Sequence, residues 1–193
     1  MNFFVSSVAL SGDGDLGGLA GADAHCVSLA SAAGAERSTW VAYLSTEGLE
    51  GGVAVNAIDR IGSGPWYNFD GDVLASDLAM LHPTVDPDVD RDGYVLVKPA
   101  DALFMDESGN AIAERSHDIF TGTEADGTVF AGRTCLDWTS NATGDIAQVG
   151  HTDTPTNRRF SPSWNSAHDT LSCRDSDIVT RGGVGLIYCF ATD

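Results

Sequence analysis

The chain has 193 residues, of which 42% are hydrophobic, so it can bury one full core and we expect a single domain over residues 1–193. Its formal net charge is −18, from 28 acidic and 10 basic residues. A surface of this charge repels nucleic acids and anionic membranes, so both are excluded as partners. No uninterrupted apolar run reaches membrane-spanning length, and we expect no membrane insertion.

The N-terminal part of the chain predicts a strand, a helix and a second strand. Residues 3–10 form a β-rich apolar run that ends at the Gly-rich turn 11–18. The next apolar positions follow helical spacing and predict a helix from about residue 22 to residue 33, with Cys26 on its core side. Residues 38–45 alternate between apolar and polar, which predicts the second strand.

The rest of the chain is predicted to consist of hairpins, short strands and loops. Residues 66–74 and 103–112 each carry a turn signal between apolar residues and predict hairpins. Further short strands are predicted at residues 117–121, 135–138 and 185–191. No repeat or flexible linker marks a domain boundary.

Four cysteines, Cys26, Cys135, Cys173 and Cys189, indicate an oxidising compartment. An even number without a Cys-x-x-Cys spacing favours disulfides over a zinc site or a redox motif. Four cysteines allow three connectivities, and their positions alone do not select one. Residues 1–10 lack the basic and long apolar regions of a signal peptide. We therefore expect the mature form of an exported protein, secreted, at the cell surface or in the periplasm.

Eight segments of the chain keep a distinctive order and spacing. They are residues 16–26, 40–45, 59–60, 119–127, 135–138, 144–150, 172–173 and 187–190. In these segments the chain resembles the endostatin domain, the C-terminal module of two vertebrate collagens, over about residues 3–191. It also resembles bacterial secreted proteins with an endostatin-like domain of unknown function, which share residues 60–66, 147–151 and 163–168.

This resemblance implies an α+β, C-type-lectin-like fold with a short-stranded, mostly antiparallel sheet, one or two helices and long loops. It also implies nested disulfides, Cys26–Cys189 and Cys135–Cys173. Two properties of endostatin are not carried over. Its heparin-binding face needs many arginines, whereas this chain has 10 basic residues in all, and no histidine cluster precedes Ser11 to match its zinc site. Because this fold hosts unrelated binding roles, function has to be argued from the site.

Residues 86–93 place carboxylates at alternate positions and end in a glycine. Oxygen ligands with one-residue spacers allow an irregular loop to wrap around Ca²⁺, so we predict a calcium site at Asp86, Asp88, Asp90 and Asp92. The downstream glutamate of an EF-hand is absent, because residues 100–101 are Ala-Asp. The alternative is an exposed acidic loop without a metal.

Three pairs of histidine and aspartate lie in the C-terminal half, and we expect the loops of a lectin-like fold to gather them on one face. Trp164 and Asn165 precede Cys173 as the Trp-Asn-Asp ligand motif of lectin-like folds precedes their third cysteine, but Ser166 replaces the aspartate, so this calcium ligand set is incomplete. Oxygen atoms would hold sugar hydroxyls or a metal while an indole stacks on the sugar. The predicted ligand face comprises Asp118, His151, Asp153, Trp164, Asn165, His168 and Asp169. The alternative is that these polar groups only form hydrogen bonds that fix the loops.

Three functions follow from these features. The first is an exported glycan-binding module with bound Ca²⁺, and the second is an adhesive or structural protein that binds another protein and has a purely structural metal. The third is a metal-dependent hydrolase in which histidines and aspartates hold Zn²⁺ and leave a position for water. No catalytic motif such as a nucleophile elbow or His-Glu-x-x-His supports the third. Convergence of His117, His151 and His168 would favour it, and burial of Trp164 would count against sugar stacking.

Overall fold

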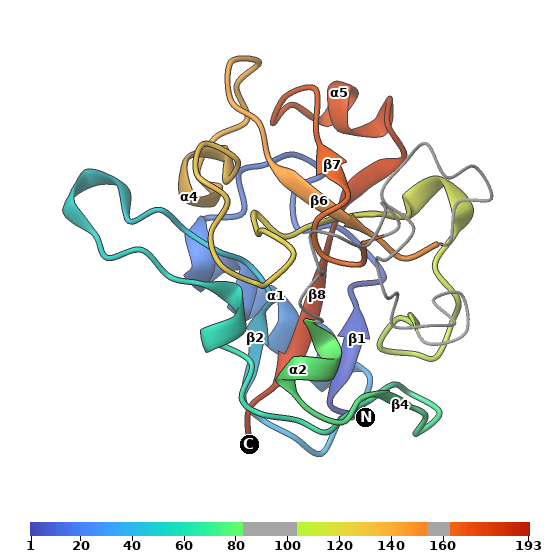
Figure 1. The fold of residues 1–193 in the computed structure, drawn as a ribbon. Coiled ribbons are helices and arrows are strands. Elements are labelled where there is room, and N and C mark those ends of the chain that lie inside the picture. The colour runs from blue at the N-terminus through green and yellow to red at the C-terminus, as the bar shows by residue number, and fades with distance from the viewer. Residues whose placement is uncertain (83–103, 154–162) are drawn as a thin grey trace, which may run out of the picture.

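The computed structural model describes residues 1–82, 104–153 and 163–193 and has an α+β fold (Figure 1). The predicted calcium ligands Asp86, Asp88, Asp90 and Asp92 lie outside these residues. The strands are β1 (Phe3–Val5), β2 (Trp40–Ala42), β3 (Trp66–Tyr67), β4 (Val73–Ala75), β5 (Asp118–Phe120), β6 (Gln148–His151), β7 (His168–Asp169) and β8 (Gly183–Ala191). The helices are α1 (Gly18–Ala32), α2 (Leu78–Leu81), α4 (Cys135–Trp138) and α5 (Asp175–Val179), with short turns of 3₁₀ helix at η1 (Leu49–Gly51), η2 (Ala57–Asp59) and η4 (Glu114–Ser116).

Strand β8 is the axis of the main sheet (Figure 1). Its C-terminal half pairs antiparallel with both β1 and β2, and its N-terminal half pairs parallel with β5. Strands β6 and β7 continue the sheet beyond β5 in antiparallel pairs. All residues of β8 except Val184 are buried, because the strand is covered on both faces. A strand in this position needs apolar side chains on both faces, and its sequence is therefore a nearly continuous apolar run.

The two faces of β8 enter two different hydrophobic clusters. Leu186, Tyr188 and Phe190 pack with one cluster, while the residues between them pack with the other. Helix α1 covers the second face, where Cys26 is fully buried as its helical spacing predicts. The alternation of side chains along a strand therefore divides the core into two layers.

Two disulfides join the cysteines in the nested order. Cys26 is bonded to Cys189 and Cys135 to Cys173, with Cα–Cα distances of 5.6 and 5.7 Å. The nested pairing implied by the sequence resemblance is thus confirmed. Two disulfides are typical of proteins from an oxidising environment. None of the described helices combines the length and the apolar composition needed to cross a membrane.

Residues 135–138 form a left-handed helical turn, α4, and the predicted strand at this position is wrong. All four residues have positive φ, from 47° at Cys135 to 66° at Trp138. This conformation costs about 1–2 kcal/mol for each residue with a side chain. The turn is held by the disulfide of Cys135, by the indole of Trp138, which donates to the Ser45 carbonyl, and by the carboxylate of Asp137. That carboxylate accepts the backbone N–H groups of Glu47 and Leu49 at 2.6 and 2.8 Å.

Other predicted elements are confirmed with different bounds. Helix α1 begins at Gly18, before the predicted start, so Asp23 lies inside the helix. There its carboxylate accepts the N–H of Ala42 and pairs with Arg60 at 2.6 Å. Residues 66–74 form the hairpin β3–β4, and the predicted hairpin at 103–112 is a bridge between Met105 and Ala111. Strands β6 and β7 and helix α5 were not predicted.

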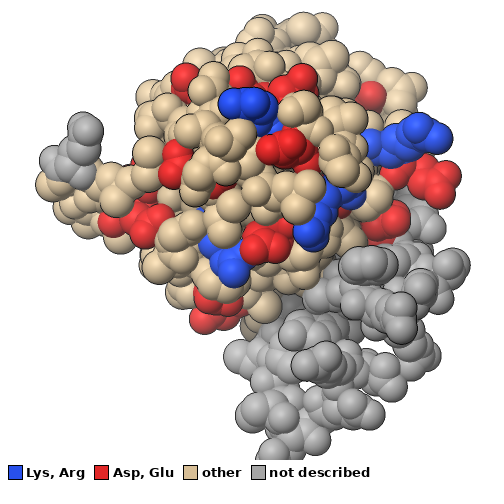
Figure 2. All heavy atoms as spheres, turned by 90° about the horizontal axis from the view of Figure 1, so that it is seen from above, with Lys and Arg blue, Asp and Glu red and all other residues tan. Residues whose placement is uncertain are grey.

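On the face seen in Figure 2, acidic and basic side chains are interspersed and the basic ones form no continuous area. Nucleic-acid binding requires a basic stripe or patch. The exclusion of nucleic acids as partners stays a prediction that rests on the net charge of −18.

We predict that Asp137→Ala lowers the free energy of unfolding by about 2–3 kcal/mol, because two charge-assisted hydrogen bonds to the 47–49 segment are lost. Urea denaturation of the oxidised protein measures the change. Glu36→Ala is the matched control, because Glu36 is an exposed acidic residue and its replacement should change stability by less than about 0.5 kcal/mol. Equal effects of the two substitutions would contradict the assigned role of Asp137.

Candidate metal centre

The pairing of β5, β6 and β7 brings three histidines and one aspartate together. Asp118 of β5 is directly opposite His151 of β6, and their side chains therefore lie on the same face of the sheet. His168 of β7 is paired with Val149, two residues before His151. His117 immediately precedes β5, at the end of the 3₁₀ turn η4.

The ring nitrogens of these histidines surround a single carboxylate oxygen. Asp118 Oδ1 lies 3.1 Å from His117 Nε2, 3.2 Å from His151 Nε2 and 3.6 Å from His168 Nε2. The His151 ring is edge-on to both other rings, with centroid separations of 5.0 and 4.9 Å. The side chains of Asp118 and His151 are only 2% and 4% exposed, whereas those of His117 and His168 are 22% and 18% exposed and border the solvent.

The opposite ring nitrogens fix the orientation of the histidines. His117 Nδ1 donates to the Glu114 carbonyl at 2.5 Å, and His168 Nδ1 donates to its neighbouring carbonyl at 2.9 Å. A carbonyl can only accept, so Nδ1 carries the hydrogen in both rings. His151 Nδ1 lies 3.7 Å from the Asp153 carboxylate, which also accepts only. In the neutral rings of His117 and His168, each Nε2 therefore directs a lone pair toward the Asp118 oxygen, and His151 Nε2 does the same when its Nδ1 carries the hydrogen.

Four acceptor groups that face one another require a cation between them. Within the described part of the chain, Asp118 Oδ1 and His151 Nε2 are buried and have no hydrogen-bond partner, because the short N···O distances lack hydrogen-bond geometry. His151 Nδ1 and Asp153 Oδ1 are also buried without a partner. Buried polar atoms without partners are rare in folded proteins. The arrangement is that expected of metal ligands and their supporting groups.

A proton can take the place of the cation in the metal-free protein. The Asp118 carboxylate raises the pKa of His117 to about 9. Burial lowers the pKa of His168, but the same carboxylate outweighs it, so the net shift is upward. Burial likewise acts to raise the pKa of Asp118, yet the three neighbouring imidazoles hold it well below its usual range. The metal-free cluster is therefore stabilised by at least one imidazolium.

The donor set selects the class of metal. His117, Asp118 and His151 offer three ligand atoms within 4.8 Å of one another. Tetrahedral Zn²⁺ with bonds of about 2.0–2.1 Å needs ligand atoms about 3.3 Å apart, close to the distances measured from Asp118. Imidazole nitrogens suit Zn²⁺, Cu²⁺ and Ni²⁺, whereas Ca²⁺ takes oxygen ligands. These residues therefore fit a transition metal better than Ca²⁺, and the calcium site predicted at Asp86, Asp88, Asp90 and Asp92 is a separate prediction outside the described residues.

A glycine makes room for one of the ligands. Gly182 has a φ of +106°, and a Cβ atom built on it would lie 2.5 Å from Cε1 of His117. Any side chain at position 182 would displace the His117 ring. The loop before β8 thus sets the position of a residue that is far away in the sequence.

The structure gathers only part of the predicted ligand face. Asp118, His151, His168 and Asp153 lie together, and His117 joins them. Asp169, from the same predicted face, instead pairs with Arg133 at 2.5 Å.

Trp164 and Asn165 are core residues, which corrects their predicted place on the ligand face. Trp164 is 5% exposed and packs on Tyr43 and Tyr188, while its indole donates to the Leu81 carbonyl at 2.8 Å. Asn165 is 1% exposed, and its amide donates to the Tyr43 hydroxyl at 3.0 Å. Residues 163–165 are buried and residues 166–169 are partly exposed, so the chain leaves the core only after Asn165. The indole has no face left for a sugar.

Comparison with known proteins adds no assignment: no protein-family model and no curated protein matches this chain.

We predict that Trp164→Ala lowers the free energy of unfolding by about 3–5 kcal/mol, because it opens a cavity in the aromatic cluster and removes a buried hydrogen bond. Thermal and urea unfolding provide the measurement. Val53→Ala, at a side chain that is 84% exposed, should change stability by less than about 0.5 kcal/mol. A Trp164 variant as stable as the wild type would place the indole at the surface.

Proposed function

We propose that this chain is an exported binding module whose cluster of His117, Asp118, His151 and His168 holds a divalent transition-metal ion, with Zn²⁺ preferred. One observation carries the proposal: three Nε2 atoms lie within 3.6 Å of one Asp118 oxygen, and neither that oxygen nor His151 Nε2, both buried, has a well-formed hydrogen bond within the described residues. Export is supported by the two disulfides, which need an oxidising environment to form.

His117, Asp118 and His151 would be the first three ligands, and Asp153 would orient His151 from behind. His168 stands slightly farther from the Asp118 oxygen, at 3.6 Å, and is the nearest candidate for the fourth position. When bound, the ion supplies a cross-link between neighbouring strands and a Lewis acid. If His168 occupies the fourth coordination position, the site would be structural. If that position stays free, the ion could bind an outside ligand.

The partner is proposed to be a protein. The sequence resemblance to endostatin-like domains supports a binding role, and the burial of Trp164 removes the stacking ring on which sugar recognition was predicted to depend. Ca²⁺ binding at Asp86, Asp88, Asp90 and Asp92 stays a separate prediction. A calorimetric titration with Ca²⁺, run beside the zinc titration described below, tests it.

A metal-dependent hydrolase is the second candidate. It is favoured by the convergence of the three histidine rings, and by a compact group of three ligands that leaves a fourth position for water. Hydrolysis of 4-nitrophenyl acetate by the zinc-loaded protein, with loss of turnover in His151→Ala, would support it. Turnover that is the same in both proteins would exclude it.

We predict that Zn²⁺ binds with a stoichiometry of one and raises the melting temperature. At a free concentration one hundred times its dissociation constant, Zn²⁺ adds about 2.7 kcal/mol to the free energy of unfolding. Calorimetric titration of chelator-treated protein measures the affinity, and a melting curve with zinc or EDTA measures the stabilisation.

His151→Ala should weaken zinc binding at least about a hundredfold. His25→Ala is the matched control, because His25 lies outside the cluster with its ring against the Val8 carbonyl. Melting curves that do not change with zinc or EDTA would refute the proposed centre. Equal weakening by both substitutions would place the zinc elsewhere.

We predict that zinc affinity falls as the pH is lowered from 9 to 6. The pKa of His117 in the metal-free protein is about 9, so below this value its ring is protonated and must lose the proton before it can bind the ion. For each proton that the ion displaces, the zinc affinity falls about tenfold with each pH unit below the pKa of that group. Calorimetry in buffers of different ionisation enthalpy counts the protons, and an affinity independent of pH over this range would contradict the expected role of His117.

A further inference from the structure

His168 lies on the two-residue strand β7 at the edge of the main sheet, where it is paired with Val149 of β6. Among the described strands, β6 is the sole neighbour of β7, so the other side of β7 has no strand to hold it. Short segments at a sheet edge are among the first to open in a folded protein. The ring of His168 therefore depends on side-chain contacts for a fixed position.

Asp169 contacts both His168 and the body of the protein. Its backbone carbonyl accepts the hydrogen of His168 Nδ1 at 2.9 Å, and its carboxylate pairs with the guanidinium of Arg133 at 2.5 Å. The carbonyl fixes the rotation of the imidazole ring, and the carboxylate fixes the backbone to which this carbonyl belongs. Histidines that bind metals have such a partner on their second ring nitrogen.

Arg133 is itself held at several points. Its guanidinium lies over the ring of Phe130, 4.5 Å from the ring centroid. Its backbone carbonyl accepts the N–H of Gln148 of β6 at 2.9 Å. Two residues later, the disulfide of Cys135 joins the same segment to Cys173, which follows β7 in the chain. Arg133 is therefore a fixed point against which β7 is held.

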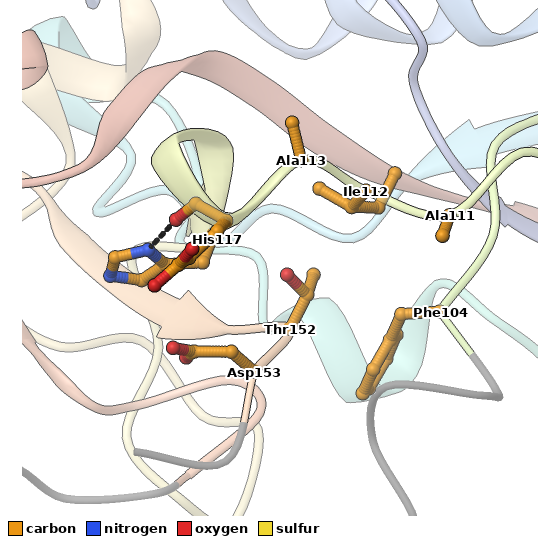
Figure 3. A pocket seen from close by; sticks show the side chains of 8 residues that line it. Phe104, Ala111, Ile112, Ala113, His117, Thr152 and Asp153 are labelled. Atoms are coloured by element: carbon orange, nitrogen blue, oxygen red, sulfur yellow. Dashed lines mark hydrogen bonds between the residues drawn. The ribbon is translucent and has the colours of Figure 1, made fainter. Parts of the chain in front are cut away.

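His117, the other partly exposed histidine of the centre, has an equivalent support. Figure 3 shows its Nδ1 bonded to the backbone carbonyl of Glu114. The rings of His117 and His168 are both edge-on to His151, with nearly equal centroid separations of 5.0 and 4.9 Å. Each of these two rings thus has the same relation to His151 and a carbonyl behind it.

The cavity next to the centre borders it on one side only. This cavity has a volume of about 330 Å³, and the side chains around it include His117 but not Asp118, His151 or His168 (Figure 3). A molecule in this cavity would contact His117 and none of the other three residues.

We infer that Arg133 is a positioning residue that, through Asp169, holds His168 as the fourth ligand of the metal centre. This inference rests on the metal centre proposed above. His168 Nε2 is 3.6 Å from Asp118 Oδ1, whereas the ligand atoms of tetrahedral Zn²⁺ are about 3.3 Å apart. His168 also stands outside the compact group of three ligands, so it is the ligand that depends most on its support.

Four protein ligands close the centre and leave no position for a catalytic water, as in structural zinc sites. The inference therefore favours a binding module over the metal-dependent hydrolase.

Arg133→Gln should weaken zinc binding about three- to tenfold, because it loosens the support of His168 and leaves all four ligands in place. A purely electrostatic role predicts the opposite sign, since the loss of a positive charge near a bound cation strengthens its binding. Calorimetric titration of zinc into chelator-treated protein measures the affinity. An affinity that is unchanged or increased would overturn the inference.

Arg181→Gln is the matched control. Burial acts to raise the pKa of Asp169, and two arginines outweigh it, Arg133 through its hydrogen bond and charge and Arg181 through its charge. Arg181 is exposed, and its substitution should leave the zinc affinity unchanged or strengthen it by less than about twofold. Equal weakening by both substitutions would overturn the positioning role.

Asp169→Asn breaks the same ion pair from its other side and serves as a second variant if Arg133→Gln does not fold. It should weaken zinc binding to a similar degree, and the double variant should bind no more weakly than either single variant. Losses that add up in the double variant would show that the two residues act separately and would overturn the inference.

Substitution with Co²⁺ reports the coordination itself, which a merely structural role of Arg133 would not alter. Azide should leave the visible spectrum of the wild-type and Arg181→Gln proteins unchanged, because no position is open. It should change the spectrum of His168→Ala and, in part, that of Arg133→Gln. A wild-type spectrum that changes with azide would show an open position and overturn the closed centre.

The wild-type titration keeps the two proposals apart. Wild-type protein that binds no zinc refutes the proposed metal centre, and this inference with it. Wild-type protein that binds zinc through His151, with an affinity and a cobalt spectrum that do not depend on Arg133, refutes only the role assigned to Arg133.

Discussion

The register of β8 against its neighbouring strands determines which side chains form each layer of the core, where the disulfide of Cys189 lies and where β5 is placed. Its alternate residues enter two separate clusters, so a shift of one residue would exchange the two layers and move Cys189 away from Cys26. The same strand fixes β5 through its parallel pairing, and β5 in turn carries Asp118. The packing of β8 in the core thus determines where Asp118 and the histidines around it lie.

The cluster at the edge of the sheet combines two costs that are normally avoided. A carboxylate is almost fully buried, and in their neutral forms the imidazoles of His117 and His168 direct lone pairs toward it. Leaving a charge buried without a partner is strongly destabilising. A proton on one of the imidazoles changes these repulsive contacts into attractive ones. In the proposed metal centre, a metal ion would take the place of that proton.

The sequence predicted local patterns well wherever one periodicity governs the backbone. The helical position of Cys26 and the strand predicted at residues 185–191 are such cases, and both are found, the strand starting two residues earlier. The left-handed turn at 135–138 could not be predicted from a strand-like pattern, because it is imposed by a disulfide and by bonds to segments about 90 residues away. Tertiary contacts there outweigh local preference.

The candidate site was predictable in kind but not in composition. The repeated pairs of histidine and aspartate indicated that side chains capable of metal binding would converge, and three of these pairs contribute to the cluster. Only the sheet register shows that Asp169 points to Arg133 while His168 points to Asp118. Trp164 lies four residues before His168, yet it belongs to the core, because the chain between them enters β7.

The central place of β8 also governs when this protein can fold. Among the described strands, β1 and β2 have β8 as their sole strand partner, so the main sheet outside β5–β6–β7 forms only after residues 183–191 have been synthesised. The contact between Phe3 and Phe190 closes a loop of almost the whole chain, and such non-local contacts make folding slow. If the chain is exported as proposed above, this delay would be useful, because a chain whose main sheet is still incomplete can be threaded through a translocation channel before the bond between Cys26 and Cys189 closes.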